Sequence, residues 1–169
     1  PMKNMPSFGG GGAVLTDNKD HYNVIKSLRR HGSGGNFEYG YNSMLSDDHA
    51  NQLLFLLTKF DRLQKLRKKA YERYKKNLPQ FNFVGADNQN QSSYHKLVLL
   101  VEKRDELKEW LAQEGIETKI HYAKTLDPSE TYPNAETFCK KAISLPIYPF
   151  LKTNEIDIVC KKIKDFYDV

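Results

Sequence analysis

The stretch from residue 46 to 78 restricts the possible folds more than any other part of the chain. Its apolar residues recur at steps of three and four, the spacing of one helix face: Ala50, Leu53, Leu54, Leu57, Phe60, Leu63, Leu66, Ala70 and Tyr74. Ser46 suits an N-cap, Asp47 and Asp48 suit the first turn, and Pro79 ends the pattern. At about 1.5 Å per residue such a helix is on the order of 45 Å long. We therefore predict one long helix that bridges two domains.

The chain before this helix, residues 1–45, has a glycine-rich start followed by one predicted strand and one predicted helix. The apolar, β-branched residues 13–16 predict a short strand. Asp17 is the predicted cap of a helix that Gly32 ends. The apolar face of that helix carries four residues: Tyr22, Val24, Ile25 and Leu28. Residues 1–45 therefore look like part of a larger sheet-containing domain.

The chain after the long helix, residues 79–169, alternates between predicted strands and helices. Residues 94–101 predict a buried strand, 118–122 a second strand and 143–147 a third extended segment. Three helices fill the gaps. The first is expected to turn Leu107, Trp110 and Leu111 inward, and the last to bury Ile156, Val159, Cys160, Ile163 and Phe166. Between them, a short helix is marked by Ala135, Phe138, Cys139 and Ala142. This order predicts an α/β module of about 90 residues.

Composition excludes several classes of protein. With 39% hydrophobic and 28% charged residues among 169, a packed core is feasible and bulk disorder is not expected. No apolar run is long enough to span a membrane. The two cysteines, Cys139 and Cys160, form no CxxC pair, and no histidines have HxxxH or HxH spacing, so we expect neither a disulfide scaffold nor a metal site. Two cysteines also suit a reducing compartment, and we expect a cytoplasmic protein.

The net charge of +5 is concentrated in one segment. Residues 59–76 contain nine Lys or Arg and two acidic residues, a local net charge of +7, so the remaining residues sum to −2. A phosphate-binding face is one interpretation. The other is the solvated side of an amphipathic helix, because most of these cations fall between the apolar positions and Tyr71 and Tyr74 lie on or beside the apolar side. We favour the second interpretation and expect no nucleic-acid partner.

Lys3 is the strongest chemical candidate at the start of the chain. A lysine forms a Schiff base when its amine is neutral and shielded from water, and nearby glycines let the backbone approach a bulky cofactor. The alternative is an exposed lysine beside a glycine-rich tail. No Gly-Lys-Ser/Thr follows, so the glycine run is not a P-loop. Local chemistry leaves both alternatives open.

Five motifs occur in a fixed order over essentially the whole chain: Pro1-Met2-Lys3-Asn4-Met5 with Gly9 to Gly12; Arg30-His31-Gly32; Gly40-Tyr41-Asn42-Ser43 with Leu45; Gly115-Ile116 with Ile120-His121-Tyr122; and Ser144-Leu145-Pro146-Ile147-Tyr148-Pro149. These motifs and their order resemble those of the DegT family of sugar-nucleotide aminotransferases, which are fold-type-I pyridoxal-phosphate enzymes. Each motif alone is modest, but five in the right order are specific.

The resemblance implies an α/β fold, namely the C-terminal part of a fold-type-I aminotransferase. Residues 1–45 are then the end of the large cofactor-binding domain, residues 46–78 the bridging helix and residues 79–169 the small domain. The resemblance also implies a homodimer with shared active sites. The ring-stacking residue and the carboxylate that pairs with the cofactor's ring nitrogen are expected in an upstream half of the same enzyme.

The resemblance implies roles for three residues. Lys3 forms the Schiff base with pyridoxal 5'-phosphate and moves the substrate proton. Asn42 reaches the cofactor phosphate of the other subunit, and His121 lies near the nucleotide-sugar substrate. The implied reaction moves an amino group, with glutamate as the expected donor, to a nucleotide-linked keto-sugar. A 4-keto-6-deoxyhexose is the favoured acceptor, and the product would serve synthesis of surface polysaccharide such as the O-antigen of lipopolysaccharide.

Three positions depart from the family pattern. Met44 stands where the family usually has arginine, and Gly10 stands where an acidic residue is common. Leu126-Asp127 replaces the usual Leu-His, which affects expected substrate contacts rather than cofactor chemistry. The alternative function is a non-catalytic α/β binding module whose basic helix contacts an acidic partner. Visible absorbance that borohydride bleaches would distinguish the enzyme from such a module.

Overall fold

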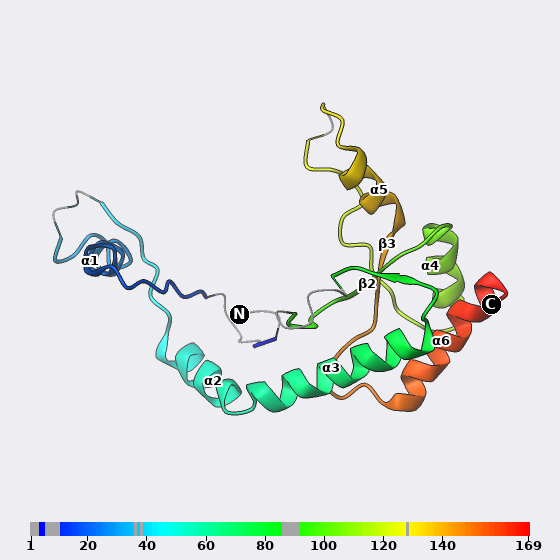
Figure 1. The fold of residues 1–169 in the computed structure, drawn as a ribbon. Helices are drawn as coiled ribbons and strands as arrows, with labels where there is room; N and C mark the ends of the chain where they lie inside the picture. The colour runs from blue at the N-terminus through cyan, green and yellow to red at the C-terminus, as the bar shows by residue number, and fades with distance from the viewer. Residues whose placement is uncertain (1–3, 6–10, 36, 38, 86–91, 128) are drawn as a thin grey trace. The chain divides into compact units, whose positions relative to one another are not determined.

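The computed structural model describes residues 4–5, 11–35, 37, 39–85, 92–127 and 129–169. The chain divides into two compact units, residues 1–60 (unit 1) and residues 61–169 (unit 2), and Figure 1 labels all their elements except β1. In chain order the elements are α1 (Lys19–Leu28), α2 (Asp47–Leu57), α3 (Phe60–Asn77), β1 (Asn82–Phe83), β2 (Leu97–Leu100), α4 (Arg104–Gln113), α5 (Pro133–Lys141), β3 (Ala142–Leu145) and α6 (Thr153–Tyr167).

Unit 2 contains a three-stranded antiparallel sheet in the order β1-β2-β3. In β2, Leu97 and Leu99 are fully buried, whereas Val98 and Leu100 on the other face are partly exposed. All four residues of β3 are buried. The predicted strand at residues 94–101 is therefore confirmed over a shorter range, and it is fully buried on one face only.

The predicted strand at residues 118–122 forms a single bridge instead. The Lys119 N–H donates to the Ser144 carbonyl over 3.0 Å, and the Ser144 N–H donates back over 2.9 Å. Continuing this antiparallel register would place Ile120 and His121 opposite Ile143 and Ala142 of β3, but neither residue forms a bridge there. The predicted strand is therefore reduced to one residue pair.

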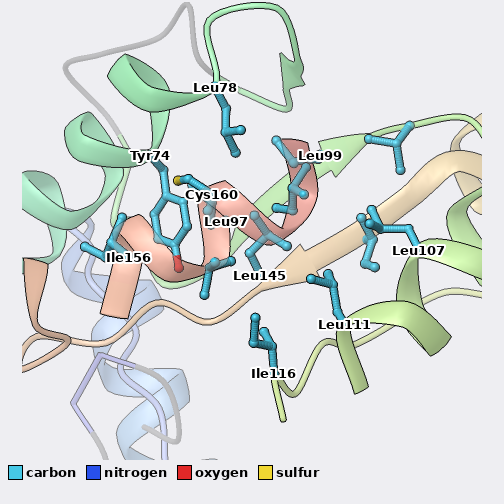
Figure 2. Packing of buried hydrophobic residues seen from close by; sticks show 14 of the residues in the cluster. Tyr74, Leu78, Leu97, Leu99, Leu107, Leu111, Ile116, Leu145, Ile156 and Cys160 are labelled. Atoms are coloured by element: carbon cyan, nitrogen blue, oxygen red, sulfur yellow. The ribbon is translucent and has the colours of Figure 1, made fainter. Parts of the chain in front are cut away.

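One hydrophobic core lies in unit 2, where α3, α4 and α6 contribute buried side chains beside those of the sheet (Figure 2). The expected inward positions of α4 and α6 are confirmed, except that Trp110 and Phe166 are only partly buried. The indole N–H of Trp110 donates to the Lys162 carbonyl over 3.1 Å, which satisfies its polar atom. The largest side chains that are fully buried in this core are Tyr74, Leu78, Leu97, Leu99, Leu107, Leu111, Ile143 and Ile163.

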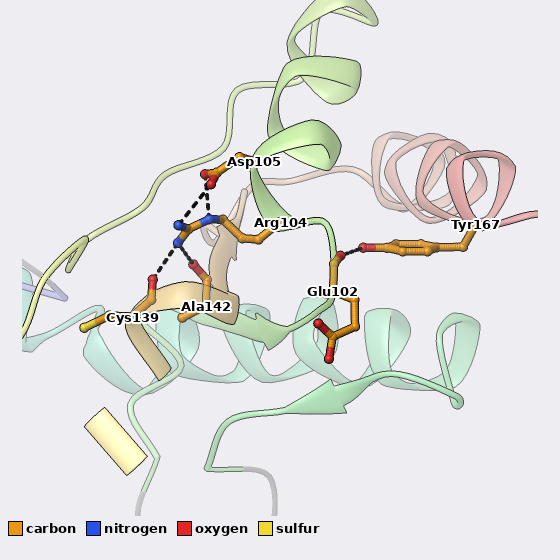
Figure 3. A network of polar contacts seen from close by, with 6 residues as sticks. All are labelled: Glu102, Arg104, Asp105, Cys139, Ala142 and Tyr167. Atoms are coloured by element: carbon orange, nitrogen blue, oxygen red, sulfur yellow. Dashed lines mark hydrogen bonds and ion pairs between the residues drawn. The ribbon is translucent and has the colours of Figure 1, made fainter. Parts of the chain in front are cut away.

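The buried Arg104 ties three segments of unit 2 together (Figure 3). Its guanidinium donates to the Cys139 carbonyl over 2.8 Å and to the Ala142 carbonyl over 3.2 Å, and its Nε lies 2.8 Å from a carboxylate oxygen of Asp105. These contacts join the start of α4 to the end of α5 and the start of β3. Just before α4, the Glu102 carbonyl accepts a hydrogen bond from the hydroxyl of Tyr167, the last residue of α6.

The prediction of one continuous helix over residues 46–78 is wrong, because Thr58 and Lys59 separate α2 from α3. The Ser46 N-cap is confirmed, since its side chain accepts from the His49 N–H over 3.4 Å. At the break, the Thr58 hydroxyl donates to the Phe55 carbonyl over 2.7 Å, and the Thr58 and Lys59 N–H groups donate to carbonyls three residues back. A threonine side chain that bonds locally to the backbone competes with the regular helical pattern.

Unit 1 differs from the prediction at two places before α1. Asn18, not Asp17, caps this helix, and its side chain accepts from the N–H groups of Asp20 and His21 over 2.8 and 3.0 Å. Residues 13–16 form no strand, and Leu15 is 94% exposed. A strand needs a neighbouring strand to satisfy its backbone, and none lies beside these residues in the described part of unit 1.

Candidate functional site

The three predicted site residues fall in different parts of the chain. Lys3 lies outside the described residues, and its role as the cofactor lysine stays a prediction. Asn42 belongs to unit 1 and His121 to unit 2.

Asn42 is held against the C-terminal end of α1 by backbone hydrogen bonds on both sides. It forms an isolated antiparallel bridge with Arg30. The Tyr41 N–H donates to the Leu28 carbonyl over 2.6 Å, and the Ser43 N–H donates to the Arg29 carbonyl over 3.1 Å. These bonds also satisfy carbonyls that a helix end leaves without partners. The position of the Asn42 backbone is thus set by the helix end.

The close approach of the two segments depends on glycine at two positions. A Cβ atom on Gly40 would lie 2.1 Å from the Gly32 nitrogen and 2.7 Å from the Leu28 carbonyl oxygen, distances that no real side chain tolerates. Gly32 has φ +79°, in the left-handed region that favours glycine. The Gly-Tyr-Asn turn and the Arg-His-Gly turn therefore form one structural unit, although twelve positions separate Asn42 from Arg30.

The chemistry around Asn42 suits an anion such as the phosphate of pyridoxal phosphate. The Asn42 side chain is exposed and makes no hydrogen bond with the described residues. Its amide N–H groups are donors, as a phosphate oxygen requires. Arg29, Arg30 and His31 follow one another on the opposite segment, and Glu38 is the only acidic residue between positions 21 and 46. The described residues therefore fit a phosphate group.

A cavity of about 870 Å³ lies in unit 1 between residues 11–16, α1 and residues 43–45. Arg29 and Ser43 line it, whereas Arg30 and Asn42 do not. Met44, at the position where the family usually has arginine, also lines this cavity. The segments that meet at the end of α1 therefore have two different faces, one toward the cavity and one bearing Asn42.

His121 is exposed in unit 2, where the backbone bends just after the Lys119 bridge. Its ring centroid lies 6.4 Å from that of Tyr122, and the Lys96 ammonium lies 5.5 Å from the centre of the Tyr122 ring. A cation over an aromatic face is an attractive arrangement. Both the imidazole and the phenol are exposed at the surface of unit 2.

Asp127, a departure from the family pattern, has a local structural role. Its carboxylate accepts hydrogen bonds from the Ser129 hydroxyl and from the Ser129 N–H, the latter over 2.9 Å. These bonds hold the pKa of the Asp127 carboxyl below its usual value. The acidic side chain thus closes a turn in the loop between Lys119 and α5.

Sequence reasoning identified Asn42 by its motif but missed its pairing with Arg30. The only available signal was a glycine-rich loop between two short segments, which is typical of a hairpin-like connection. The residue types do not indicate which positions pair. The register is set by the backbone hydrogen bonds at the end of α1.

Comparison with solved structures defines the class of the protein as an aminotransferase fold. A Streptomyces venezuelae structure, described as DesV in complex with a ketimine intermediate, superimposes with a TM-score of 0.89 at 26% identity, covering 98% of this chain and 49% of that one. An aminotransferase from Brucella abortus gives a TM-score of 0.84 at 25% identity, covering 92% and 46% of the two chains. The expected α/β aminotransferase fold is confirmed.

The chain belongs to the DegT/DnrJ/EryC1/StrS aminotransferase family, which it matches over residues 1–164. Among curated relatives, it is 30% identical to the dTDP-3-amino-3,4,6-trideoxy-alpha-D-glucose transaminase of Streptomyces venezuelae, over 90% of this chain and 44% of the relative. It is 29% identical to the pleiotropic regulatory protein of Geobacillus stearothermophilus, over 99% and 50%. The chain thus spans about half the length of the curated relatives it matches.

Within the described residues, no helix combines the length and the apolar character needed to cross a membrane. In the same part of the chain, no three His, Cys, Asp or Glu side chains gather in a way that would hold a metal ion.

Proposed function

We propose that the complete protein is a pyridoxal-phosphate-dependent aminotransferase that transfers an amino group from glutamate to a nucleotide-linked keto-sugar. The observation that carries the proposal is the family match over residues 1–164, which includes the motifs of Lys3, Asn42 and His121. Relatives named as transaminases of dTDP- and UDP-linked sugars, and one named as a GDP-perosamine synthase, support the substrate class.

In this proposal, three residues have separate roles. Lys3 holds the cofactor covalently and moves a proton at the substrate carbon. Asn42 donates to the cofactor phosphate across a homodimer interface, and His121 contacts the nucleotide sugar. Pyridoxal phosphate, when bound, would supply an electron sink. An upstream half of the enzyme completes the cofactor pocket and keeps water out.

The favoured acceptor is a 4-keto-6-deoxyhexose, and the favoured pathway is surface-polysaccharide synthesis. Relatives at 28% identity include a GDP-perosamine synthase and a UDP-4-amino-4,6-dideoxy-N-acetyl-beta-L-altrosamine transaminase. Other relatives are named for amination at carbon 3, so the acceptor carbon must be tested directly. A matched pair of 3-keto and 4-keto sugars on the same nucleotide is the appropriate comparison.

The test is an amino-transfer assay with the complete enzyme, pyridoxal phosphate, glutamate and a panel of nucleotide keto-sugars. We expect 2-oxoglutarate to form with a 4-keto-6-deoxy sugar, and a visible absorbance band that borohydride removes. A protein without this band and without turnover on any sugar would instead match the alternative, a binding module that contacts an acidic partner through its basic helix.

A further inference from the structure

We propose that Arg30 is a second phosphate-binding residue, which acts beside Asn42 on the same anion. This inference rests on the proposed function, because the anion in question is the phosphate of pyridoxal phosphate. It adds to that function a guanidinium that the sequence motif alone did not assign. The pairing of the two backbone segments carries it.

The hydrogen-bond pattern shows which type of pair Arg30 and Asn42 form. The His31 N–H donates to the Tyr41 carbonyl, and the Ser43 N–H donates to the Arg29 carbonyl, both over 3.1 Å. These bonds join the residues that flank the pair, so Arg30 and Asn42 are a non-hydrogen-bonded antiparallel pair. In such pairs the Cα atoms lie about 4.5 Å apart and both side chains project from one face.

The two faces of this pairing have different surroundings. Arg29 and Ser43, the flanking residues, line the cavity of unit 1. Arg30 and Asn42 are exposed and lie outside that cavity lining. Among the described residues, neither side chain has an ion-pair or hydrogen-bond partner. A cation and an amide therefore project together from one face, available to a ligand.

The donors of this pair suit a phosphate, because together they can bind three oxygens and a carboxylate offers only two. A guanidinium donates through a planar fork and can bind two phosphate oxygens at once. The Asn42 amide supplies a neutral donor to a third oxygen. Gly40 and Gly32 keep the segments in contact, so the two donors sit on a backbone that adopts one register.

The experiment compares two ligands that differ only in the phosphate, using the complete enzyme prepared without cofactor. Equilibrium binding of pyridoxal phosphate and of pyridoxal is measured for the wild type, Arg30→Gln, Arg30→Lys and Asn42→Ala. Arg29→Gln is the matched control, because it removes the same charge one residue away on the cavity face. We expect Arg30→Gln to weaken pyridoxal phosphate binding about tenfold or more, as loss of a charged hydrogen bond does.

Pyridoxal affinity should not change in Arg30→Gln, and Arg30→Lys should recover part of the loss. Equal weakening of both ligands, or equal weakening in Arg29→Gln, would overturn the inference. A wild type that binds neither ligand would overturn the proposed function and the inference with it. If Asn42→Ala weakens pyridoxal phosphate binding and Arg30→Gln does not, the proposed function survives and the inference about Arg30 fails.

Discussion

Unit 1 and unit 2 both contain amphipathic helices, yet among the described residues only those of unit 2 form a hydrophobic core. In α3, Tyr74 is fully buried and Ala70 is 5% exposed. In α2, Leu54 and Phe55 are 61% and 64% exposed. No hydrophobic residue described in unit 1 is buried. Apolar spacing therefore predicts that a helix forms, whereas burial depends on whether another element offers it a surface.

The proposed cofactor-binding residues and the packed core also belong to different units. The motifs of Lys3 and Asn42 belong to unit 1, whose apolar side chains are largely exposed. The packed core belongs to unit 2. Substitutions in unit 1 should therefore change cofactor binding and chemistry, and substitutions in unit 2 should change the free energy of unfolding.

The largest expected effect is on catalysis by the 169-residue chain alone. We expect no transamination, because unit 1 exposes apolar surface and its described residues enclose no cofactor pocket with water excluded. The measurement is 2-oxoglutarate formation from glutamate with nucleotide keto-sugars, with the complete enzyme as control. Turnover at about 1 per second or more, an ordinary enzymatic rate, would contradict the need for an upstream half.

Lys3→Ala should abolish activity in the complete enzyme while leaving the fold intact. Without the lysine amine, no covalent link to the cofactor forms and no group moves the substrate proton. Loss of the visible band and unchanged circular dichroism would support the assignment. An active Lys3→Ala enzyme would show that another residue carries the cofactor.

A matched pair of leucines tests the core directly. In the isolated chain, Leu111→Ala should lower the free energy of unfolding by about 2–5 kcal/mol, because Leu111 is fully buried in unit 2. Leu54→Ala, at a 61% exposed position in α2, should stay within about 0.5 kcal/mol. Denaturant unfolding measures both. A comparable cost at Leu54 would show that unit 1 has a core after all.

The junction between α3 and α6 should make unit 2 sensitive to acid. Arg73 donates to both carboxylate oxygens of Asp157 over 2.8 and 2.7 Å, and Asn77 donates over 2.7 Å. These donors hold the pKa of the Asp157 carboxyl below its usual value. Their stabilisation is therefore present above the unfolded-state pKa of about 3.9 and is lost as pH falls through the lower folded-state pKa.

The measurement is the melting temperature of the chain between neutral pH and strong acid, for the wild type and Asp157→Asn. The variant should melt lower than the wild type at neutral pH, and the gap should close in acid. A gap that stays constant over the whole range would mean that the ion pair contributes nothing that depends on the Asp157 charge.

The smallest expected effect concerns the basic face of α3. Five of its cations have neither an ion-pair nor a hydrogen-bond partner among the described residues: Arg62, Lys65, Lys69, Lys75 and Lys76. Weak duplex binding is expected at low salt, since phosphate contacts release counterions. It should disappear near physiological salt. Tight, sequence-dependent binding at that salt, measured by fluorescence anisotropy, would favour the binding-module alternative.

Buried positions could be predicted from the sequence where the helical spacing of apolar residues agrees with the tertiary packing. The inward residues of α4 and α6, such as Leu107 and Ile163, followed from helical spacing because the sheet covers that face. The break at Thr58 was missed, since a single hydroxyl bond to Phe55 interrupts a pattern that otherwise continues. Asn18 and Asp17 are both good caps, so propensity alone could not decide between them.

For the candidate site, motif order identified the residues but not their geometry. Asn42 was predicted from the Gly-Tyr-Asn motif, and its neighbour across the bridge was not. Pairing between segments on either side of a loop depends on register, which is set by contacts far apart in the sequence. The roles of Lys3, Asn42 and His121 therefore remain predictions for the experiments above.

The contact at Gly40 has a consequence for how this chain can vary in evolution. Every codon change that replaces glycine adds at least a Cβ atom, and at this position that atom would meet backbone at 2.1 Å rather than a movable side chain. In a saturation library, position 40 should therefore accept no replacement, whereas Gly12, with open space around it, should accept small ones. A lineage that loses this glycine cannot recover function by adjusting a neighbouring side chain, and must revert or rebuild the turn.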